Sequence, residues 1–192
     1  MTDRLRGFKH RFTDGDEMAS FLCGIGGALR EHGTLEDLFC RGMPASGSFA
    51  PASGGAYSGV AGAMDAFASD VLGWGGLDSS HLLPRASKGS ACKRLALYIR
   101  WMARRDDVDP GGWSKVSPCD IIVPLDTHMF HIASGLGFTA RSSADGRAAM
   151  EATAAFRRLR PDDPVRYDFA LTRFGIRTGM SVDELLAKFA RV

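Results

Sequence analysis

The stretch that decides the fold is Ser90-Ala-Cys-Lys-Arg-Leu-Ala-Leu-Tyr-Ile-Arg-Trp-Met-Ala-Arg-Arg105, in which apolar side chains recur at helical spacing. Its apolar stripe consists of residues separated by four, three and four positions: Ala91, Leu95, Tyr98 and Met102. The basic side chains Lys93, Arg100 and Arg104 fall on the opposite side. The stretch therefore predicts an amphipathic helix with an apolar face and a basic face.

Helix start and stop signals recur along the rest of the chain, whereas apolar and polar residues seldom alternate. The predicted helices run from Thr13 or Asp14 to about His32, from Thr34 onward, and over about 60–72, 127–134, 144–159, 163–174 and 182–191. The apolar run from Pro118 to Pro124 fits a short helix or an extended connection. The fold class expected from this pattern is all-α.

The chain has 192 residues, which is enough for one domain or a compact pair of domains. We expect a single all-helical domain over residues 1–192. It would consist of N-terminal helices over 8–42, a Gly/Ser/Pro-rich loop over 43–58, a helix–hairpin–helix region over 79–105 and C-terminal helices over 118–192.

Composition excludes several classes of protein. No apolar run approaches the roughly 18 residues of a membrane span, and no secretory signal follows Met1, so we expect a cytoplasmic protein without membrane contact. The four cysteines contain no C-x-x-C pair, which argues against zinc-finger and thioredoxin motifs. Buried or free thiols are favoured over an iron–sulfur site assembled from distant segments.

Charge is concentrated in one window although the chain is nearly neutral, with 24 basic and 22 acidic residues. The segment from His81 to Arg105 contains seven basic residues and no acidic one. A cationic face of this kind attracts phosphates, and its contribution to binding falls with salt. The alternative is a solvated helix face without a ligand.

The segment from Leu82 to Lys93 predicts a short helix, a tight turn with Pro84 and Gly89, and then the long helix. Such a hairpin can hold a phosphate through backbone N–H groups and the positive end of the helix dipole. An ordinary helix–helix connection remains the alternative. The candidate DNA-binding residues are Arg85, Ser87, Lys88, Gly89, Ser90 and Arg94, together with His128.

Lys93 and Asp126 are the candidate catalytic residues. Lys93 begins a helix amid other cations, and this setting disfavours the protonated amine and favours a nucleophile. Asp126 precedes a helix, where N–H groups favour an ionised carboxylate. The alternatives are helix capping for Asp126, and a phosphate contact or solubility for Lys93. His128 and His131 have a ligand-pair spacing but no clear third ligand, so we expect no metal.

Two motifs resemble a known superfamily. They are Leu83-Pro-Arg-Ala-Ser-Lys-Gly-Ser-Ala-Cys-Lys93 and Pro124-Leu-Asp-Thr-His-Met-Phe-His-Ile-Ala-Ser-Gly-Leu-Gly137. Together they resemble the helix–hairpin–helix DNA glycosylases. The segments Gly89–Arg104, Asp107-Val-Asp-Pro-Gly-Gly-Trp113 and Asp163-Pro-Val-Arg-Tyr-Asp-Phe-Ala-Leu-Thr-Arg-Phe-Gly-Ile176 are more closely similar to a bacterial family called domain of unknown function 2400. That similarity extends from about Gly7 to Arg177.

The resemblance also implies which residues are catalytic. The lysine of the endonuclease III type aligns with Gly89, so that assignment fails. Archaeal 8-oxoguanine glycosylases are more similar, because their lysine lies one turn further into the helix and their aspartate follows about thirty residues later. Lys93 and Asp126, 33 residues apart, match this pattern, and Lys88 is the second candidate for the amine.

The resemblance implies a base-excision DNA glycosylase with abasic-site lyase activity on a damaged purine such as 8-oxoguanine. Lys93 would form a Schiff base, and no metal or cofactor would be needed. The expected partner is double-stranded DNA with a damaged base or an abasic site, bound by a nucleoid-associated monomer. Arg85, Ala86 and Ser87 replace the usual glycine pair of the hairpin, which weakens phosphate binding there.

A second hypothesis is a non-catalytic DNA-binding module. The resemblance implies that N-terminal helices of the glycosylase fold are missing, and a reduced chain could retain the basic face without a working pocket. A third, weaker hypothesis is an enzyme that acts on RNA or nucleotides through the same lysine. Strand scission separates the module from the enzyme, and competition by single-stranded RNA tests the third.

Overall fold

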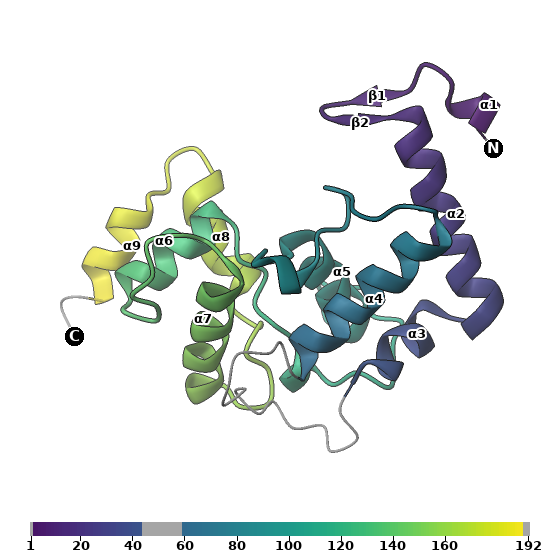
Figure 1. Ribbon diagram of the computed structural model, residues 1–192. Helices are drawn as coiled ribbons and strands as arrows, with labels where there is room; N and C mark the ends of the chain where they lie inside the picture. The colour runs from purple at the N-terminus through teal and green to yellow at the C-terminus, as the bar shows by residue number, and fades with distance from the viewer. Residues whose placement is uncertain (1, 44–58, 190–192) are drawn as a thin grey trace. The chain divides into compact units, whose positions relative to one another are not determined.

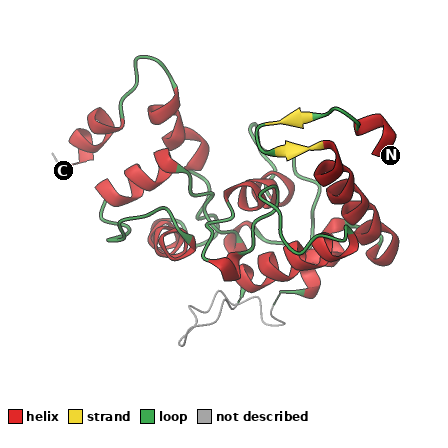
Figure 2. Ribbon diagram, turned by 45° about the horizontal axis from the view of Figure 1, so that its top comes forward, coloured by secondary structure: helices red, strands yellow, loops and turns green. Residues whose placement is uncertain are grey.

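The computed structural model describes residues 2–43 and 59–189, whose regular secondary structure is helical apart from one small two-stranded sheet (Figure 1; Figure 2). The predicted all-α fold class is confirmed. The chain divides into two compact units, Met1–Lys88 and Gly89–Val192. The predicted loop over 43–58 lies, after Met43, outside the described residues. Within the described part of the chain, no helix is long and apolar enough to cross a membrane.

The first unit contains, in order, α1 (Thr2–Leu5), β1 (Lys9–His10), β2 (Thr13–Asp14), α2 (Gly15–His32), α3 (Leu35–Arg41), α4 (Val60–Trp74) and the 3-10 turn η1 (Ala86–Lys88). Strands β1 and β2 pair antiparallel, with Lys9 opposite Asp14. They were not predicted, because strands of two residues are too short to show alternation. Helices α2, α3 and α4 pack on one another and form the core of this unit.

Capping residues fix the ends of these helices where the sequence predicted them. Asp14 accepts a hydrogen bond of 2.9 Å from the Glu17 N–H at the start of α2. Thr34 accepts a hydrogen bond of 3.0 Å from the Asp37 N–H at the start of α3. Helix α2 approaches α4 closely at Gly24, where a Cβ atom would overlap the backbone of the other helix. A larger residue at this position would push the two helices apart.

The second unit contains α5 (Lys93–Ala103), the 3-10 turn η2 (Pro118–Asp120), α6 (Thr127–Gly135), α7 (Gly146–Leu159), α8 (Asp168–Ile176) and α9 (Val182–Phe189). Helix α6 packs against α7, α8 and α9. The segment between η2 and α6 is extended, and its residues 121–125 are buried. Val123 donates its N–H to the Thr153 hydroxyl of α7 at 2.9 Å. The Pro118–Pro124 run therefore combines both predicted alternatives, a short 3-10 turn followed by an extended core segment.

Two helix starts and one expected short helix differ from the predictions. Helix α5 begins at Lys93 rather than Ser90, because Cys92 has a left-handed backbone (φ +47°) that ends the preceding turn. Helix α8 begins at Asp168 rather than at residue 163, after a series of turns. The short helix expected ahead of the hairpin turn is absent, since residues 78–85 form bends and extended chain. Pro84 has no N–H to donate to a helix there.

Candidate functional site

Lys93 is the first residue of α5, as predicted for a residue in the first turn of the long helix. Its side chain is 46% exposed. No side chain caps this helix end, because the preceding residue, Cys92, is buried and left-handed. The amine of Lys93 therefore lies at an accessible and uncapped helix N-terminus.

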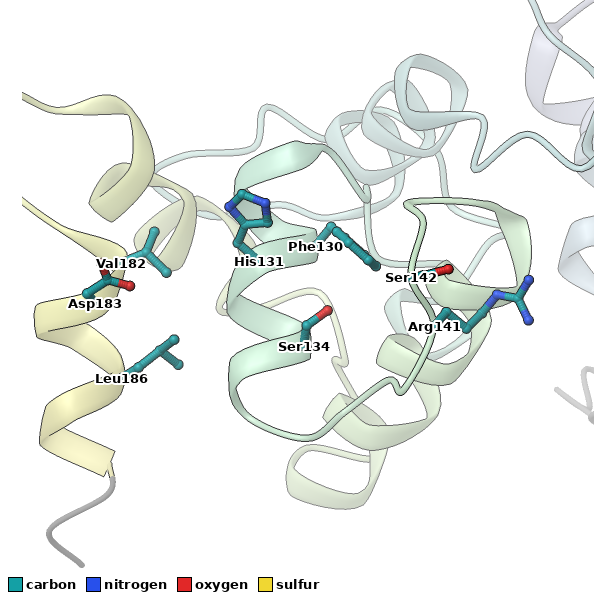
Figure 3. Close-up of a pocket in the computed structure, with 8 residues that line it drawn as sticks. All are labelled: Phe130, His131, Ser134, Arg141, Ser142, Val182, Asp183 and Leu186. Atoms are coloured by element: carbon teal, nitrogen blue, oxygen red, sulfur yellow. The ribbon is translucent and has the colours of Figure 1, made fainter.

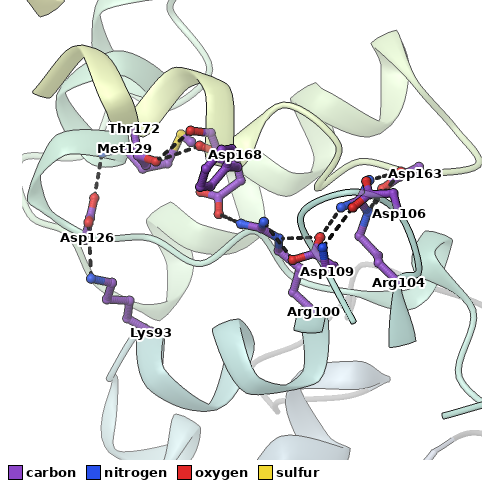
Figure 4. Close-up of polar contacts among 11 residues, drawn as sticks. Lys93, Arg100, Arg104, Asp106, Asp109, Asp126, Met129, Asp163, Asp168 and Thr172 are labelled. Carbon is purple, nitrogen blue, oxygen red and sulfur yellow. Dashed lines mark hydrogen bonds and ion pairs between the residues drawn. The ribbon is translucent and has the colours of Figure 1, made fainter. Parts of the chain in front are cut away.

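Asp126 precedes α6 and caps it, as predicted. One carboxylate oxygen, Oδ1, accepts the Met129 N–H at 2.8 Å. The other, Oδ2, lies 3.2 Å from the Nζ of Lys93. Figure 4 shows the carboxylate of Asp126 between the helix end and the amine. The two predicted catalytic residues are thus brought together, and the helix cap fixes the orientation of the carboxylate.

A pocket of about 270 Å³ lies beside this pair, within the second unit. Helix α5 contributes residues at positions i, i+4, i+7 and i+8, which share one helix face. Helix α8 contributes residues at i, i+1, i+4 and i+8. The residues that line the pocket are Lys93, Leu97, Arg100, Trp101, Val108, Pro124, Asp126, Asp168, Phe169, Thr172 and Ile176. The pocket combines apolar walls with a few charged groups, which is the usual composition of a small-molecule site.

The second half of α5 corrects the prediction of an exposed basic face. Arg100 and Arg104 are buried, with 2% and 6% of their surface exposed. Arg100 donates two hydrogen bonds to Asp109, of 3.1 and 2.9 Å, and one to Asp168. Arg104 donates to Asp106, Asp109 and Asp163 (Figure 4). The apolar stripe predicted only part of the buried face of α5. The arginines are buried as well, because aspartates from segments outside the helix neutralise them.

Asp168 is a residue of the pocket that the sequence analysis did not single out. It is buried and pairs with Arg100 through Oδ2. Burial raises the pKa of Asp168 to about 6; Arg100 lowers it, and the carboxylates of Asp126 and Asp109 raise it. The sequence around Asp168, Arg166-Tyr167-Asp168-Phe169, does not indicate that this residue lines a pocket, because its partner Arg100 lies 68 residues earlier.

The predicted DNA-binding residues of the first unit are partly engaged in local contacts. Arg85 forms an ion pair of 2.7 Å with Asp65 of α4, and the Ser87 N–H donates to the same carboxylate at 2.8 Å. Burial alone would raise the pKa of Asp65, but the hydrogen bonds from Arg85 and Ser87 lower it below its ordinary value. Lys88 is exposed at the end of η1. Arg85 and the Ser87 backbone therefore attach this segment to α4 through the Asp65 carboxylate.

The predicted DNA-binding residues of the second unit also make structural contacts. Gly89 accepts the N–H of Gly146 at 2.9 Å, and Ser90 accepts the Cys92 N–H at 3.1 Å. Arg94 is exposed on α5. His128 faces Gly175 of α8, where a Cβ atom would overlap the imidazole ring. Its close packing against α8 gives His128 a structural position.

These contacts correct the expectation of one continuous cationic face over His81–Arg105. Four of its seven basic residues form ion pairs with aspartates: Arg85, Lys93, Arg100 and Arg104. The local charge excess seen in the sequence is therefore largely offset by aspartates that lie outside this window. All four cysteines are free thiols, and Cys92 is buried.

A second pocket, of about 520 Å³, lies between α6, α9 and the loop before α7 (Figure 3). Its lining residues are Phe130, His131, Ser134, Arg141, Ser142, Val182, Asp183 and Leu186. None of the predicted catalytic or DNA-binding residues is among them. In Figure 3, Arg141 points away from the other lining side chains, and it binds Asp145 at 2.6 Å. We therefore treat the smaller pocket beside Lys93 as the candidate site.

The arrangement beside the smaller pocket suits nucleophilic chemistry on an electrophilic carbon. An amine can attack, and the carboxylate beside it can take a proton or offset developing positive charge. The apolar walls can exclude water and hold a planar group. Each of these elements is provided by the chain's own side chains.

Comparison with known proteins identifies a family but no named relative. Residues 1–177 match the family described as "Protein of unknown function (DUF2400)". No curated protein and no solved structure matches the chain. Because the match covers most of the chain, including every residue of the Lys93 pocket, the protein belongs to the DUF2400 family.

Proposed function

We propose that the protein is a base-excision DNA glycosylase with abasic-site lyase activity, acting on a damaged purine such as 8-oxoguanine. The observation that carries this proposal is the distance of 3.2 Å between the Lys93 amine and the Asp126 carboxylate at the edge of a pocket. The resemblance of the Leu83–Lys93 and Pro124–Gly137 motifs to helix–hairpin–helix glycosylases supports the same assignment of the two residues.

The proposed reaction begins with eversion of the damaged nucleotide, which costs a few kcal/mol of stacking and pairing energy. The neutral amine of Lys93 attacks C1′ of the sugar, and the bond from C1′ to the base breaks with its electron pair leaving on the base. A proton lost by the amine balances the proton gained by the base. The C1′–O4′ bond then breaks with its electron pair on O4′, which takes up a proton, while the lone pair of the lysine nitrogen forms the C=N bond of the protonated Schiff base.

Asp126 has two roles in this scheme. Its carboxylate offsets the positive charge that develops on the sugar as the glycosidic bond breaks. It also accepts the proton that Lys93 must lose, since the two groups are already in ion-pair contact. Because Oδ1 is held by the Met129 N–H, Oδ2 is the oxygen directed at the amine.

The Schiff base then permits strand cleavage. Loss of a proton from C2′ and departure of the 3′ phosphate break the C3′–O3′ bond by β-elimination, which leaves an unsaturated aldehyde attached to the lysine until water releases it. The lyase step does not require a nucleobase in the pocket, so a duplex with an abasic site is a sufficient substrate. Activity on abasic DNA therefore tests Lys93 and Asp126 separately from recognition of the base.

Borohydride trapping tests the proposal. A duplex with one 8-oxoguanine and a duplex with one abasic site are incubated with the wild type, Lys93→Ala, Asp126→Asn and Lys88→Ala. We expect a covalent adduct with the wild type and with Lys88→Ala, a much weaker adduct with Asp126→Asn, and none with Lys93→Ala. An adduct that persists in Lys93→Ala and disappears in Lys88→Ala would transfer the role to Lys88.

Absence of any adduct with wild-type protein, despite measurable binding of the duplex, would contradict the lyase. It would favour the non-catalytic DNA-binding module. That module would bind DNA in a salt-sensitive manner without cleaving it.

A further inference from the structure

Asp168 has an unused acceptor at the candidate site. Its side chain is 4% exposed, and it lines the same pocket as Lys93 and Asp126. The Oδ2 atom accepts a hydrogen bond from Arg100, whereas the Oδ1 atom is buried without a hydrogen-bond partner among the described residues. A buried acceptor without a partner destabilises the folded state, so its presence in a folded protein calls for an explanation.

Arg100 does not fully compensate the charges around Asp168. The groups that interact with Asp168 are Arg100 from α5, Asp109 from the loop after α5, and Asp126 from the start of α6. Asp109 also binds Arg100, through two hydrogen bonds of 3.1 and 2.9 Å. Arg100 is therefore shared between Asp109 and Asp168, and Asp109 has a second guanidinium partner in Arg104. A ligand that donates an N–H group would supply the partner that the Oδ1 atom of Asp168 lacks among the described residues.

The walls next to Asp168 suit a flat ring. Phe169 follows it on α8, and Trp101 on α5 also lines the pocket. Their side chains remain substantially exposed, 41% for Phe169 and 44% for Trp101. Exposed aromatic rings of this kind stack favourably on nucleobases. An everted base against these walls would present its polar edge to Asp168.

On the basis of the proposed glycosylase function, we propose that Asp168 selects the base, its Oδ1 atom accepting a hydrogen bond from a ring N–H of the everted nucleobase. Purines with a hydrogen on ring nitrogen 1, such as 8-oxoguanine and hypoxanthine, meet this requirement. Adenine-type rings present a lone pair at that position, which a carboxylate repels. Sites built to bind a substrate N–H reject analogues without it by large factors.

Asp168→Asn reverses the polarity of this contact with little change in volume. The amide oxygen replaces Oδ2 as the acceptor for Arg100, so the amide N–H group takes the position of Oδ1. The matched control is Asp163→Asn, because Asp163 binds Arg104 in the same network and does not line the pocket. Both variants remove one negative charge.

The experiment measures single-turnover excision from duplexes that carry 8-oxoguanine or 8-oxoadenine, together with borohydride trapping on an abasic duplex. We expect the wild type to prefer 8-oxoguanine at least about tenfold. In Asp168→Asn this preference should fall at least about tenfold, with a larger loss of 8-oxoguanine excision than of abasic trapping. Asp163→Asn should keep the wild-type preference.

The outcomes separate the inference from the proposed function. No trapping of the abasic duplex by the wild type would overturn the glycosylase proposal, and the role of Asp168 with it. Trapping by the wild type without a preference for 8-oxoguanine, or without excision of either base, would overturn the role of Asp168 alone. An unchanged preference in Asp168→Asn, or an equal loss of trapping and excision, would also overturn it.

Discussion

The two ends of α5 pair cations with aspartates in different ways. At the C-terminal end, Arg100 and Arg104 are almost completely buried, and their hydrogen bonds hold the loop after α5 and the start of α8. At the N-terminal end, the Lys93 side chain is 46% exposed and makes one ion pair with Asp126 beside a pocket. The buried pairs hold the fold together, whereas the exposed pair is accessible to a substrate.

Removal of a buried partner gives the largest effect that we expect. Asp109 is fully buried and accepts hydrogen bonds from both arginines. Asp109→Ala leaves two buried guanidinium groups without their shared acceptor, so the free energy of unfolding should fall by about 3–5 kcal/mol. Urea unfolding followed by circular dichroism measures this change. A loss below about 1 kcal/mol would show that the network does not stabilise the fold.

Asp168 binds Arg100 near the C-terminal end of α5, and it also lines the pocket beside Lys93 at the N-terminal end. Its pKa is raised from the ordinary 3.8 to about 6, so the folded chain binds this proton more tightly than the unfolded chain. Its contribution to stability is therefore largest below about pH 4 and is lost as the pH rises to about 6. The wild type should lose stability relative to Asp168→Asn over this window, by an amount on the order of 3 kcal/mol.

Urea unfolding of both proteins at several pH values between 4 and 7 gives this difference. Carboxylates that do not interact with Asp168 cancel, because they are common to the two proteins. A difference that does not change with pH would show that Asp168 has an ordinary pKa and is not strained by its neighbours.

A smaller effect separates the two roles of Asp126. Asp126→Ala removes the cap that binds the Met129 N–H, so the free energy of unfolding should fall by about 1 kcal/mol. Asp126→Asn retains a capping oxygen, so its stability should stay close to that of the wild type, while the proposed trapping activity falls. Thermal unfolding and trapping assays on both variants measure the two effects. Equal stability loss in both variants would contradict a separable cap.

The smallest stability effect is expected for Lys93→Ala. A partly exposed ion pair contributes about 0–1 kcal/mol, and alanine is favourable in a helix. The free energy of unfolding should therefore change by less than about 1 kcal/mol, in contrast to Asp109→Ala. Urea unfolding of the two variants side by side tests this contrast. A loss comparable to that of Asp109→Ala would make Lys93 a structural residue.

Local signals predicted most of the fold. Helix caps are local features, so Asp14, Thr34 and Asp126 could be identified from the sequence, and the structure confirms their hydrogen bonds. The start of α8 was predicted too early, because residues 163–167 form turns and Asp163 binds Arg104, which lies 59 positions earlier. Contacts of that range have no periodic signal in the helix itself.

The candidate site was predicted only in part. The spacing of Lys93 and Asp126 and the family resemblance brought these two residues together before the structure did. The same reasoning treated Arg100 as an exposed cation and gave Asp168 no role, although both line the pocket. A charged residue is expected at the surface unless its partner is known, and the partners here lie in separate segments.

The most direct test of the central claim is the position of the covalent bond. Wild-type protein is trapped with borohydride on an abasic duplex, digested with trypsin and nuclease, and analysed by peptide mass spectrometry. We predict that the sugar remnant is attached to Nζ of Lys93. A remnant attached only to Lys88 or to another amine, with Lys93 unmodified, would contradict the assignment of Lys93 as the nucleophile.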